Sequence, residues 1–245
     1  MTSSPPEAIL PTQDRGPVSG EGLTSDRLRD RMVARLRKQG IQDETVLRAM
    51  QAVPRHAFVD PGLASRAYED SALPIGHSQT ISQPYVVARA IALACMFLGP
   101  QNSGGMGRVL EVGGGCGYQA AVLAQVFGEV YSVERIEGLH LQARRNLFAL
   151  ALPNLHLLHA DGMSLPVGLG PFRAIFLAAG MPSIPEHLLR ELEPGGVLVA
   201  PIGAPTQRLV VIRSLAIAAN DRVPEYERRE FEEVSFVPIL RGIQS

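Results

Sequence analysis

The feature that most constrains the fold is a glycine-rich turn, Glu111-Val112-Gly113-Gly114-Gly115-Cys116-Gly117, between a short apolar segment and a segment of helical character. Gly113, Gly115 and Gly117 stand where a Cβ atom would block a ligand or strain the turn. A strand that enters such a turn and a helix that leaves it form the core of α/β folds that bind nucleosides. The turn therefore predicts an α/β domain with a nucleoside-containing cofactor.

From residue 108 onward, the sequence alternates between apolar segments of strand length and segments of helical period. This alternation predicts a parallel, Rossmann-like sheet with helices on both faces. Two later strands have no helix between them, which predicts an antiparallel addition at the edge of the sheet. We expect strands at 108–112, 129–133, 155–159, 172–178, 197–202, 209–212 and 231–237, and helices at 118–127, 137–150 and 185–192.

The N-terminal region has a different character. Residues 1–24 are rich in proline and glycine and lack a basic start and an apolar stretch, which predicts a flexible tail and no secretory signal. Apolar residues at helical spacing predict a helix over 25–38. Asp43 is placed to cap a second helix, and Pro84 to open a third that ends near residue 98. Residues 56–83 have no clean period and predict an irregular segment.

Composition and charge disfavour several classes of function. The net charge of −1 gives no general attraction to nucleic acid or to an anionic membrane, and no apolar run reaches the length of a membrane span. Two cysteines are too few for a secreted disulfide framework, so we expect a cytoplasmic protein. The six histidines show no metal-ligand spacing, so we expect no metal.

Three acidic positions lie at predicted strand ends: Glu111, Glu134, and Asp161 before Gly162. Glu134 can accept hydrogen bonds from both ribose hydroxyls, and Asp161 or its neighbouring backbone can meet the adenine amine. A dinucleotide-binding turn would need a glycine where Tyr118 stands, and a carboxylate at Glu111 would repel a pyrophosphate. Glu111 suits a cofactor with a cationic end, which favours S-adenosylmethionine.

The most distinctive segment is Leu73-Pro74-Ile75-Gly76-His77-Ser78-Gln79-Thr80-Ile81-Ser82-Gln83-Pro84-Tyr85. Shorter motifs accompany it: Gly40-Ile41-Gln42-Asp43, Val53-Pro54-Arg55, Ser132-Val133-Glu134-Arg135 and Phe236-Val237-Pro238. Together with the glycine turn, these motifs resemble those of the protein-L-isoaspartate O-methyltransferases from residue 36 to residue 242. The long segment is similar to that family's substrate and cofactor loop.

This resemblance implies transfer of a methyl group from S-adenosylmethionine to the free α-carboxylate of L-isoaspartyl residues in damaged proteins or peptides, a protein repair reaction. It implies an active-site role for Ser82, cofactor-proximal positions for Thr80 and Ile81, and an edge element at Val237-Pro238 that flanks the substrate. Ser82 is also placed to cap the helix that follows it. The carboxylate nucleophile is already ionised at neutral pH, so the chemistry needs no catalytic base.

With this resemblance, we expect one methyltransferase domain over residues 25–245. It would contain N-terminal helices and the substrate loop at 25–100, the cofactor-binding core at 107–203 and C-terminal edge strands at 204–245. The expected partners are isoaspartyl proteins and peptides, with neither nucleic acid nor membrane, and a monomer is favoured.

Several residues depart from the family pattern. Gly114 and Cys116 stand where Thr or Ser is common, Arg173 where an Asp usually opens the fourth strand, and Ala178 where a hydroxylated residue ends it. His77-Ser78 replaces a more typical Gln-Gly pair. These departures leave open a divergent member that binds S-adenosylmethionine with lost or altered catalysis.

A small-molecule or RNA methyltransferase on the same fold is a further alternative, because the helix expected at 25–38 carries six basic residues. We interpret these residues as a solvated helix face, since the rest of the chain supplies no balancing basic surface. The amine-methylation motif Asn/Asp-Pro-Pro-aromatic is also absent at residues 177–182, where the fourth strand of the predicted core ends.

Overall fold

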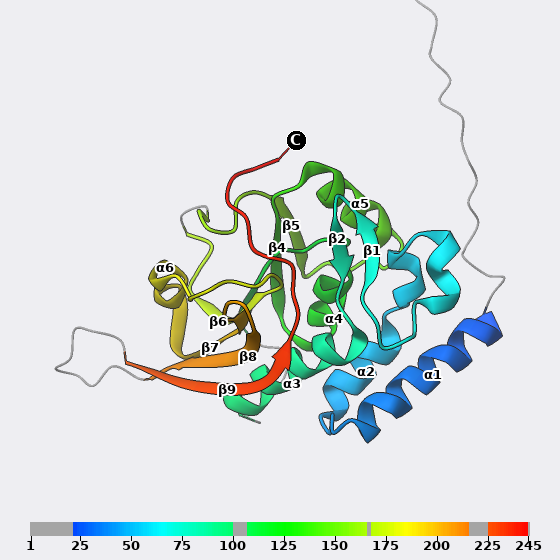
Figure 1. Cartoon of the computed structure of the whole chain (residues 1–245), viewed down its shortest axis with the longest axis horizontal. Helices are drawn as coiled ribbons and strands as arrows, with labels where there is room; N and C mark the ends of the chain where they lie inside the picture. Colours follow the sequence, from blue (N-terminus) through cyan, green and yellow to red (C-terminus); the bar gives the residue numbers. More distant parts are fainter. Residues whose placement is uncertain (1–21, 100–106, 166–167, 216–224, 245) are drawn as a thin grey trace, which may run out of the picture.

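The computed structural model describes residues 22–99, 107–165, 168–215 and 225–244. A seven-stranded sheet in the order β5-β4-β3-β6-β7-β8-β9 forms its centre (Figure 1). Strands β3 to β7 are parallel, whereas β8 and β9 are antiparallel additions at one edge, as the sequence predicted. The strands are β3 Arg108–Val112, β4 Glu129–Glu134, β5 Leu155–His159, β6 Phe172–Leu177, β7 Leu192–Ile202, β8 Gln207–Ser214 and β9 Tyr226–Val234.

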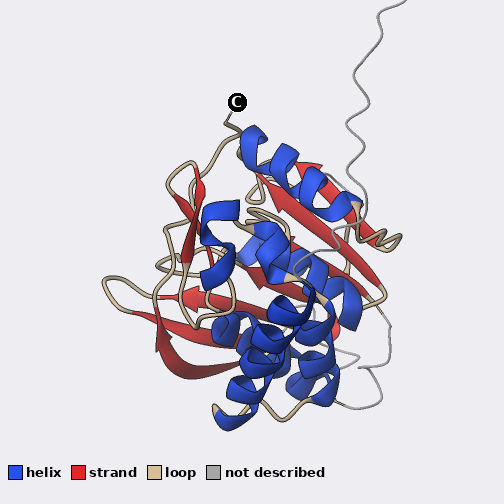
Figure 2. Ribbon diagram, turned by 90° about the vertical axis from the view of Figure 1, so that its right-hand side faces the viewer, coloured by secondary structure: helices blue, strands red, loops and turns tan. Residues whose placement is uncertain are grey.

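Side chains alternate between the two faces of the sheet, so each central strand contributes to two separate cores. In β3, for example, Val109 belongs to one apolar cluster and Leu110 to the other. Five helices supply residues to the first cluster, whereas among the described residues the short α6 is the only helix that does so for the second. Figure 2 shows the helices in blue and the strands of the sheet in red. The helices are α1 Gly22–Lys38, α2 Glu44–Ala52, α3 Pro84–Leu98, α4 Tyr118–Val126, α5 Glu137–Phe148 and α6 Glu186–Arg190.

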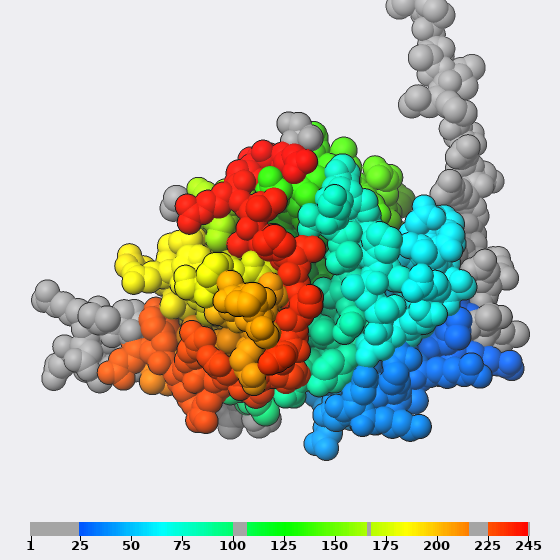
Figure 3. All heavy atoms as spheres, in the orientation of Figure 1, coloured from blue at the N-terminus to red at the C-terminus, as the bar shows by residue number. Residues whose placement is uncertain are grey.

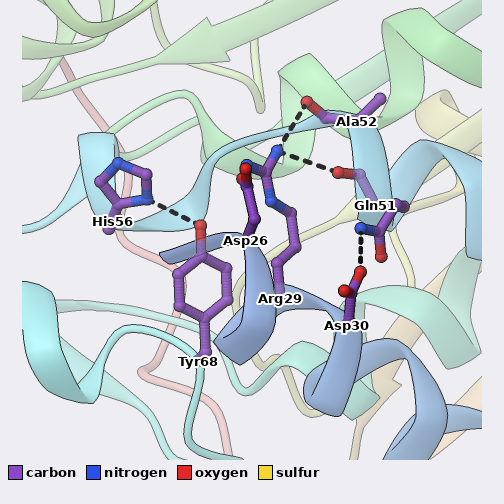
Figure 4. Close-up of polar contacts among 7 residues, drawn as sticks. All are labelled: Asp26, Arg29, Asp30, Gln51, Ala52, His56 and Tyr68. Carbon is purple, nitrogen blue, oxygen red and sulfur yellow. Dashed lines mark hydrogen bonds and ion pairs between the residues drawn. The ribbon is translucent and has the colours of Figure 1, made fainter. Parts of the chain in front are cut away.

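Arg29, one of the basic residues of helix α1, binds the C-terminal end of helix α2. The Arg29 guanidinium donates to the carbonyl oxygen of Gln51 at 3.0 Å and contacts Asp26, while the Gln51 amide donates to Asp30 at 2.7 Å (Figure 4). Cations near a helix C-terminus satisfy its last carbonyl groups. The interpretation of these basic residues as a solvated face is therefore wrong for Arg29, whose side chain is only 16% exposed.

The predicted starts of two helices are confirmed. Asp43 caps α2 by accepting hydrogen bonds from the backbone of Thr45 and Val46, and Pro84 lies in the first turn of α3. The expectation that Ser82 caps α3 is wrong, because the cap position belongs to Gln83 and no side chain bonds there. This frees the Ser82 hydroxyl from the helix end.

The segment expected to be irregular contains two short 3-10 helices, η1 Arg55–Phe58 and η2 Pro61–Arg66, and a hairpin that the sequence did not reveal. The hairpin pairs β1 Leu73–Gly76 with β2 Gln79–Ile81. Its strands are only four and three residues long, too short to show a period of two. The tail predicted at 1–24 falls largely outside the described residues, and α1 begins three residues before the predicted helix.

Several strand boundaries differ from the prediction. Strand β8 covers Gln207–Ser214 instead of 209–212, and β9 begins at Tyr226 instead of residue 231. Strand β7 starts at Leu192 instead of residue 197, and β9 ends at Val234 instead of residue 237. Residues beyond Val234 leave the sheet because β8 begins at Gln207, opposite Val234, and offers no further backbone partner. Strand β9 runs in the same direction as β7, so the chain leaves it at the carboxyl ends of the parallel strands.

Candidate cofactor and substrate site

A cavity of about 650 Å³ opens at the carboxyl ends of the parallel strands. It lies beside β3, the strand whose neighbours β4 and β6 lead to opposite halves of the sheet. In open α/β sheets this point of reversal is where ligands bind. Six of the residues predicted for cofactor binding line the cavity, namely Thr80, Gly113, Gly115, Glu134, Asp161 and Gly162.

The glycine turn owes its shape to a left-handed backbone. Gly113, Gly115 and Gly117 have φ of 93°, 55° and 88°, values that residues with a Cβ rarely adopt. Gly113 and Gly115 line the cavity, whereas Gly117 lies under α5, where a Cβ would come within 2.8 Å of Leu147. Gly117 therefore serves the packing of the helix on the turn, and its predicted contact with the cofactor stays a prediction.

Glu111 is fully buried beneath the turn. Its Oε2 accepts a hydrogen bond of 2.5 Å from the Ser132 hydroxyl, but its Oε1 has no partner among the described residues. Burial raises the pKa of this carboxyl to about 7, and the hydrogen bond from Ser132 opposes the rise. An unpartnered buried carboxylate oxygen is costly unless a ligand group completes it. Glu111 lines a second space, of about 360 Å³, next to the main cavity.

Glu134 ends β4 and is 7% exposed. Its Oε2 accepts from the backbone N–H of Gly115 and its Oε1 from that of Ile136, both at 2.8 Å. The carboxylate thus fixes the glycine turn to the end of the next strand. Each carboxylate oxygen retains a lone pair toward the cavity, so these bonds are compatible with the predicted acceptor role.

Asp161 and Gly162 follow β5 on the opposite wall of the cavity. The Asp161 carboxylate accepts from the backbone N–H of Met163 at 2.9 Å and of Gly242 at 2.8 Å. At Gly162 any Cβ would overlap the side chain of Val112 at the end of β3. The small residue therefore lets the loop after β5 approach the central strand closely.

The C-terminal strap, residues 235–244, closes the cavity from above. Gly180 donates to the carbonyl of Val237 and accepts from the N–H of Ile239, both at 2.8 Å, and Arg135 donates to the carbonyl of Gly242 at 2.7 Å. Val237, Pro238, Ile239 and Leu240 line the cavity. Figure 3 shows the strap in red against the hairpin region in cyan.

The sequence predicted only part of the C-terminal strap. The Val237-Pro238 element was expected at the substrate, but Ile239, Leu240 and Gly242 carried no recognisable signal. They lie in a segment without periodicity, and their contacts reach residues about sixty to a hundred positions away. The position of the strap depends on the pairing of Gly180 with Pro238, which no local sequence pattern predicts.

A third cavity, a cleft of about 1450 Å³, lies between α3 and the end of β9. Thr80 and Ala178 line all three spaces, and Ser82 lines the cleft and the space at Glu111. Ile81 is buried and lines only the latter space. The three spaces therefore converge around the hairpin's last residues and the end of β6.

Comparison with known proteins identifies the family. The model of the family described as Protein-L-isoaspartate(D-aspartate) O-methyltransferase matches residues 27–244. The protein-L-isoaspartate O-methyltransferase of Bordetella parapertussis is 56% identical over 237 residues, which is 96% of this chain and 87% of the relative. The chain belongs to the protein-L-isoaspartate O-methyltransferase family.

Further relatives agree. The protein-L-isoaspartate O-methyltransferase of Methylobacillus flagellatus is 50% identical, over 92% of this chain and 97% of its own. A solved protein-L-isoaspartate O-methyltransferase structure superposes with a TM-score of 0.72 at 27% identity, covering 88% of this chain and 67% of the other. A putative one from Plasmodium falciparum, in complex with S-adenosyl-L-homocysteine, gives a TM-score of 0.71 at 24% identity, covering 86% and 97%.

Family membership confirms the predicted Rossmann-like fold, the isoaspartyl methyltransferase activity and S-adenosylmethionine as methyl donor. No helix in the described part of the chain is long and apolar enough to cross a membrane. Over the same residues, no three histidine, cysteine, aspartate or glutamate side chains lie close enough together to hold a metal ion.

The departures from the protein-L-isoaspartate O-methyltransferase pattern fall in different places. At Gly114 a Cβ would overlap the Ser132 hydroxyl, which occupies that space and bonds to Glu111. Cys116 is buried, and burial raises the pKa of its thiol to about 11, so it stays neutral. The Ser132 hydroxyl, on the neighbouring strand β4, thus occupies the space that a side chain at position 114 would need.

The other departures lie on either side of the reaction site. Arg173 lies near the start of β6, the end away from the cavities, and pairs with Glu193 at 3.8 Å. His77 is exposed at the hairpin tip, where its ring lies over Gly138 at the start of α5. Of these departures, Ala178 alone stands where all three cavities meet.

Proposed function

We propose that this chain methylates the free α-carboxylate of L-isoaspartyl residues at the point where its three cavities meet. The observation that carries the proposal is the shared lining: Thr80 and Ala178 border all three spaces, and Ser82 borders two. A methyl donor held along the glycine turn and a peptide held in the cleft would face each other there. Proximity and orientation of this kind alone contribute roughly 7–11 kcal/mol to catalysis.

The residues that line the main cavity and the adjoining space at Glu111 suit S-adenosylmethionine from one end to the other. Glu111, with its unpartnered Oε1, would accept hydrogen bonds from the α-ammonium group. Glu134 would accept from the ribose hydroxyls, and the loop Asp161-Gly162 would meet adenine. When bound, this cofactor supplies an electrophilic methyl group on a cationic sulfur.

The side chains of the site need to orient the substrate carboxylate, and none of them needs to remove a proton from it. The substrate carboxylate is already anionic at neutral pH, since its ordinary pKa is about 3.5–4. Its oxygen attacks the methyl carbon, the carbon–sulfur bond breaks, and the electron pair stays on sulfur, so no proton moves. Ser82, half-buried and free of a capping role, would donate a hydrogen bond that aims the attacking carboxylate.

The product is a methyl ester on the damaged residue. A methoxide is a better leaving group than an oxide, so the neighbouring backbone nitrogen can close a succinimide that reopens partly to normal aspartate. Recognition of many damaged proteins would rest on backbone contacts in the cleft and not on neighbouring side chains. The expected monomeric state and cytoplasmic location stay predictions.

One assay tests the proposal directly. Purified protein is incubated with methyl-labelled S-adenosylmethionine and an isoaspartyl peptide, beside the same peptide with normal aspartate. We expect base-labile label on the isoaspartyl peptide alone. Cofactor binding without any transfer would instead support a divergent member that has lost catalysis.

The Ser82→Ala variant tests the role of the hydroxyl. We expect kcat to fall roughly tenfold to a hundredfold because the carboxylate loses its alignment, with little change in cofactor affinity. Ser183→Ala is a suitable control, since Ser183 is exposed and borders none of the three cavities. Equal kcat values for both variants would contradict the assignment of Ser82.

A further inference from the structure

The antiparallel ladder between β8 and β9 ends where the substrate cleft begins. Its last pair on this side joins Gln207 to Val234. The chain nevertheless continues in the same direction through Ser235, Phe236 and Val237, and all three residues line the cleft. Backbone groups that leave a sheet while still partly buried need new partners.

The side chain of Gln207 supplies those partners. Its Oε1 accepts a hydrogen bond of 2.8 Å from the N–H of Phe236, and its Nε2 donates one of 3.1 Å to the carbonyl oxygen of the same residue. A primary amide offers one acceptor and one donor side by side, as a peptide unit of a neighbouring strand does. The amide therefore extends the ladder by one pair beyond the end of β8.

A glycine on β6's exit loop leaves room for this amide. At Gly180 a Cβ would overlap the Nε2 atom of Gln207. The backbone of Gly180 also holds the next part of the strap, through Val237 and Ile239. Gln207 therefore holds the strap at Phe236, and Gly180 holds it at Val237 and Ile239. Val237 lines both the cleft and the cofactor cavity.

We propose that Gln207 is a positioning residue that sets the substrate-facing wall of the cleft by holding Phe236 and, through it, Val237. The inference rests on the proposed function, because it assigns the cleft to the isoaspartyl peptide. Without the amide, the strap remains tied to Gly180 and Asp161 but loses both bonds at Phe236. The wall of the cleft would then move while the cofactor cavity keeps its other anchors.

Kinetics separate this role from a general structural one. For Gln207→Ala we expect the KM for an isoaspartyl peptide to rise roughly tenfold, with kcat and the cofactor dissociation constant changed by less than about threefold. Gln207→Glu keeps the acceptor but turns an oxygen toward the Phe236 carbonyl, so its KM should rise at least as much. An unchanged KM in both variants would overturn the proposal.

A control variant removes another glutamine amide, which makes a single side-chain hydrogen bond. Gln51 lies on α2 and bonds to Asp30, far along the chain from the cleft (Figure 4). Gln51→Ala should lower stability without changing the KM for the peptide. A similar rise in KM for this control would show that the effect of Gln207 is general loosening of the fold.

The crowded contact at Gly180 allows a second, independent test. Gly180→Ala should push the Gln207 amide aside and raise the peptide KM as Gln207→Ala does. Because both changes break the same two bonds, the double variant should show the effect of one and not their product. Multiplying effects would mean that the two residues act separately and would overturn the inference.

Amide hydrogen exchange makes the result independent of activity. In the full-length protein, the N–H of Phe236 should exchange faster in Gln207→Ala and in Gly180→Ala than in the wild type. Absence of methyl transfer by the wild type would defeat the proposed function alone. Wild-type protection of Phe236 in both variants would defeat the positioning role, whatever the enzyme's activity.

Discussion

The two halves of the site are built in different ways. In the cofactor half, at the carboxyl ends of β3, β4 and β5, each key side chain lies at a strand end or directly follows one: Glu111, Glu134 and Asp161. In the substrate half, the hairpin β1–β2 and the C-terminal strap come from opposite ends of the chain. There, Glu232 receives hydrogen bonds from Tyr85 and Arg89, 147 and 143 residues away.

This difference has a physical consequence. The cofactor half is part of the parallel sheet, whose backbone ladder positions the strand ends where its acids stand. The substrate half depends on side chains and single backbone bonds that tie loops together, such as the Gln207 amide on Phe236. We therefore expect substitutions in the cofactor half to change ligand affinity at a fixed geometry, and those in the substrate half to change geometry itself.

The largest effect is expected from Glu111→Gln. Loss of a charged hydrogen bond to the α-ammonium group should cost about 1.5–3 kcal/mol, or roughly tenfold to a hundredfold in the dissociation constant of S-adenosylmethionine. The KM for the isoaspartyl peptide should change far less, because Glu111 does not border the cleft. Calorimetry of cofactor binding and peptide kinetics give the two numbers, and equal losses in both would break the division into halves.

The same residue predicts a pH dependence. Burial raises the pKa of Glu111 to about 7 in the cofactor-free protein, so the carboxylate that binds an ammonium group is lost as pH falls below that value. Cofactor affinity should drop roughly tenfold for each pH unit below about 7, and the drop should vanish in Glu111→Gln. A pH profile shared by the wild type and the variant would contradict this origin.

The free energy of unfolding of the cofactor-free protein should depend on pH in the opposite direction to cofactor affinity. Between pH 4.5 and about 7 the folded protein holds a proton on Glu111 that the unfolded chain has released, so the free energy of unfolding falls as pH rises through this window. Above about pH 7, Glu111→Gln should therefore stabilise the cofactor-free protein, by at most about 3 kcal/mol at 1.36 kcal/mol per pKa unit. Urea unfolding at pH 8 compares the two proteins.

A smaller loss is expected from Glu134→Ala. This change removes the acceptor for the ribose and leaves the N–H groups of Gly115 and Ile136 without their partner, so cofactor affinity should fall about tenfold. Glu129→Ala is the matched control, because Glu129 lies at the other end of the same strand and pairs with Arg108. If both variants bind S-adenosylmethionine alike, the assignment of Glu134 is wrong.

The same division explains what the sequence could predict. Hydrophobic period and the glycine turn located all seven strands of the central sheet and the acids at their ends, because these signals lie within a few residues of one another. Residues 73–81 and Val237-Pro238 were singled out only through motifs that resemble the family, and the hairpin and the strap themselves were not predicted. Their shape depends on partners such as Asp161 for Gly242, a pairing that no local pattern encodes.

The departures from the family pattern show the same limit. From the sequence, Gly114 removes a hydroxyl from the turn, but the Ser132 hydroxyl fills that space from β4. Arg173 and Ala178 are only five residues apart in the sequence, yet they lie at opposite ends of strand β6. Because Ala178 lies at the cavities and Arg173 lies at the other end of β6, we expect the two departures to affect ligand binding differently.

The smallest effect is therefore expected from Arg173→Asp, which restores the usual residue of the family. Arg173 borders none of the three cavities, and within the part of the chain that the structure describes its ion pair is to Glu193 at 3.8 Å. Replacing it should leave the cofactor dissociation constant and the peptide KM unchanged. Ala178→Thr, at the other end, should alter the peptide KM, because Ala178 lines both the cofactor cavity and the cleft. A change in cofactor affinity on Arg173→Asp would mean that the amino end of β6 is coupled to the site through the sheet, and that neither half is held by its own contacts alone.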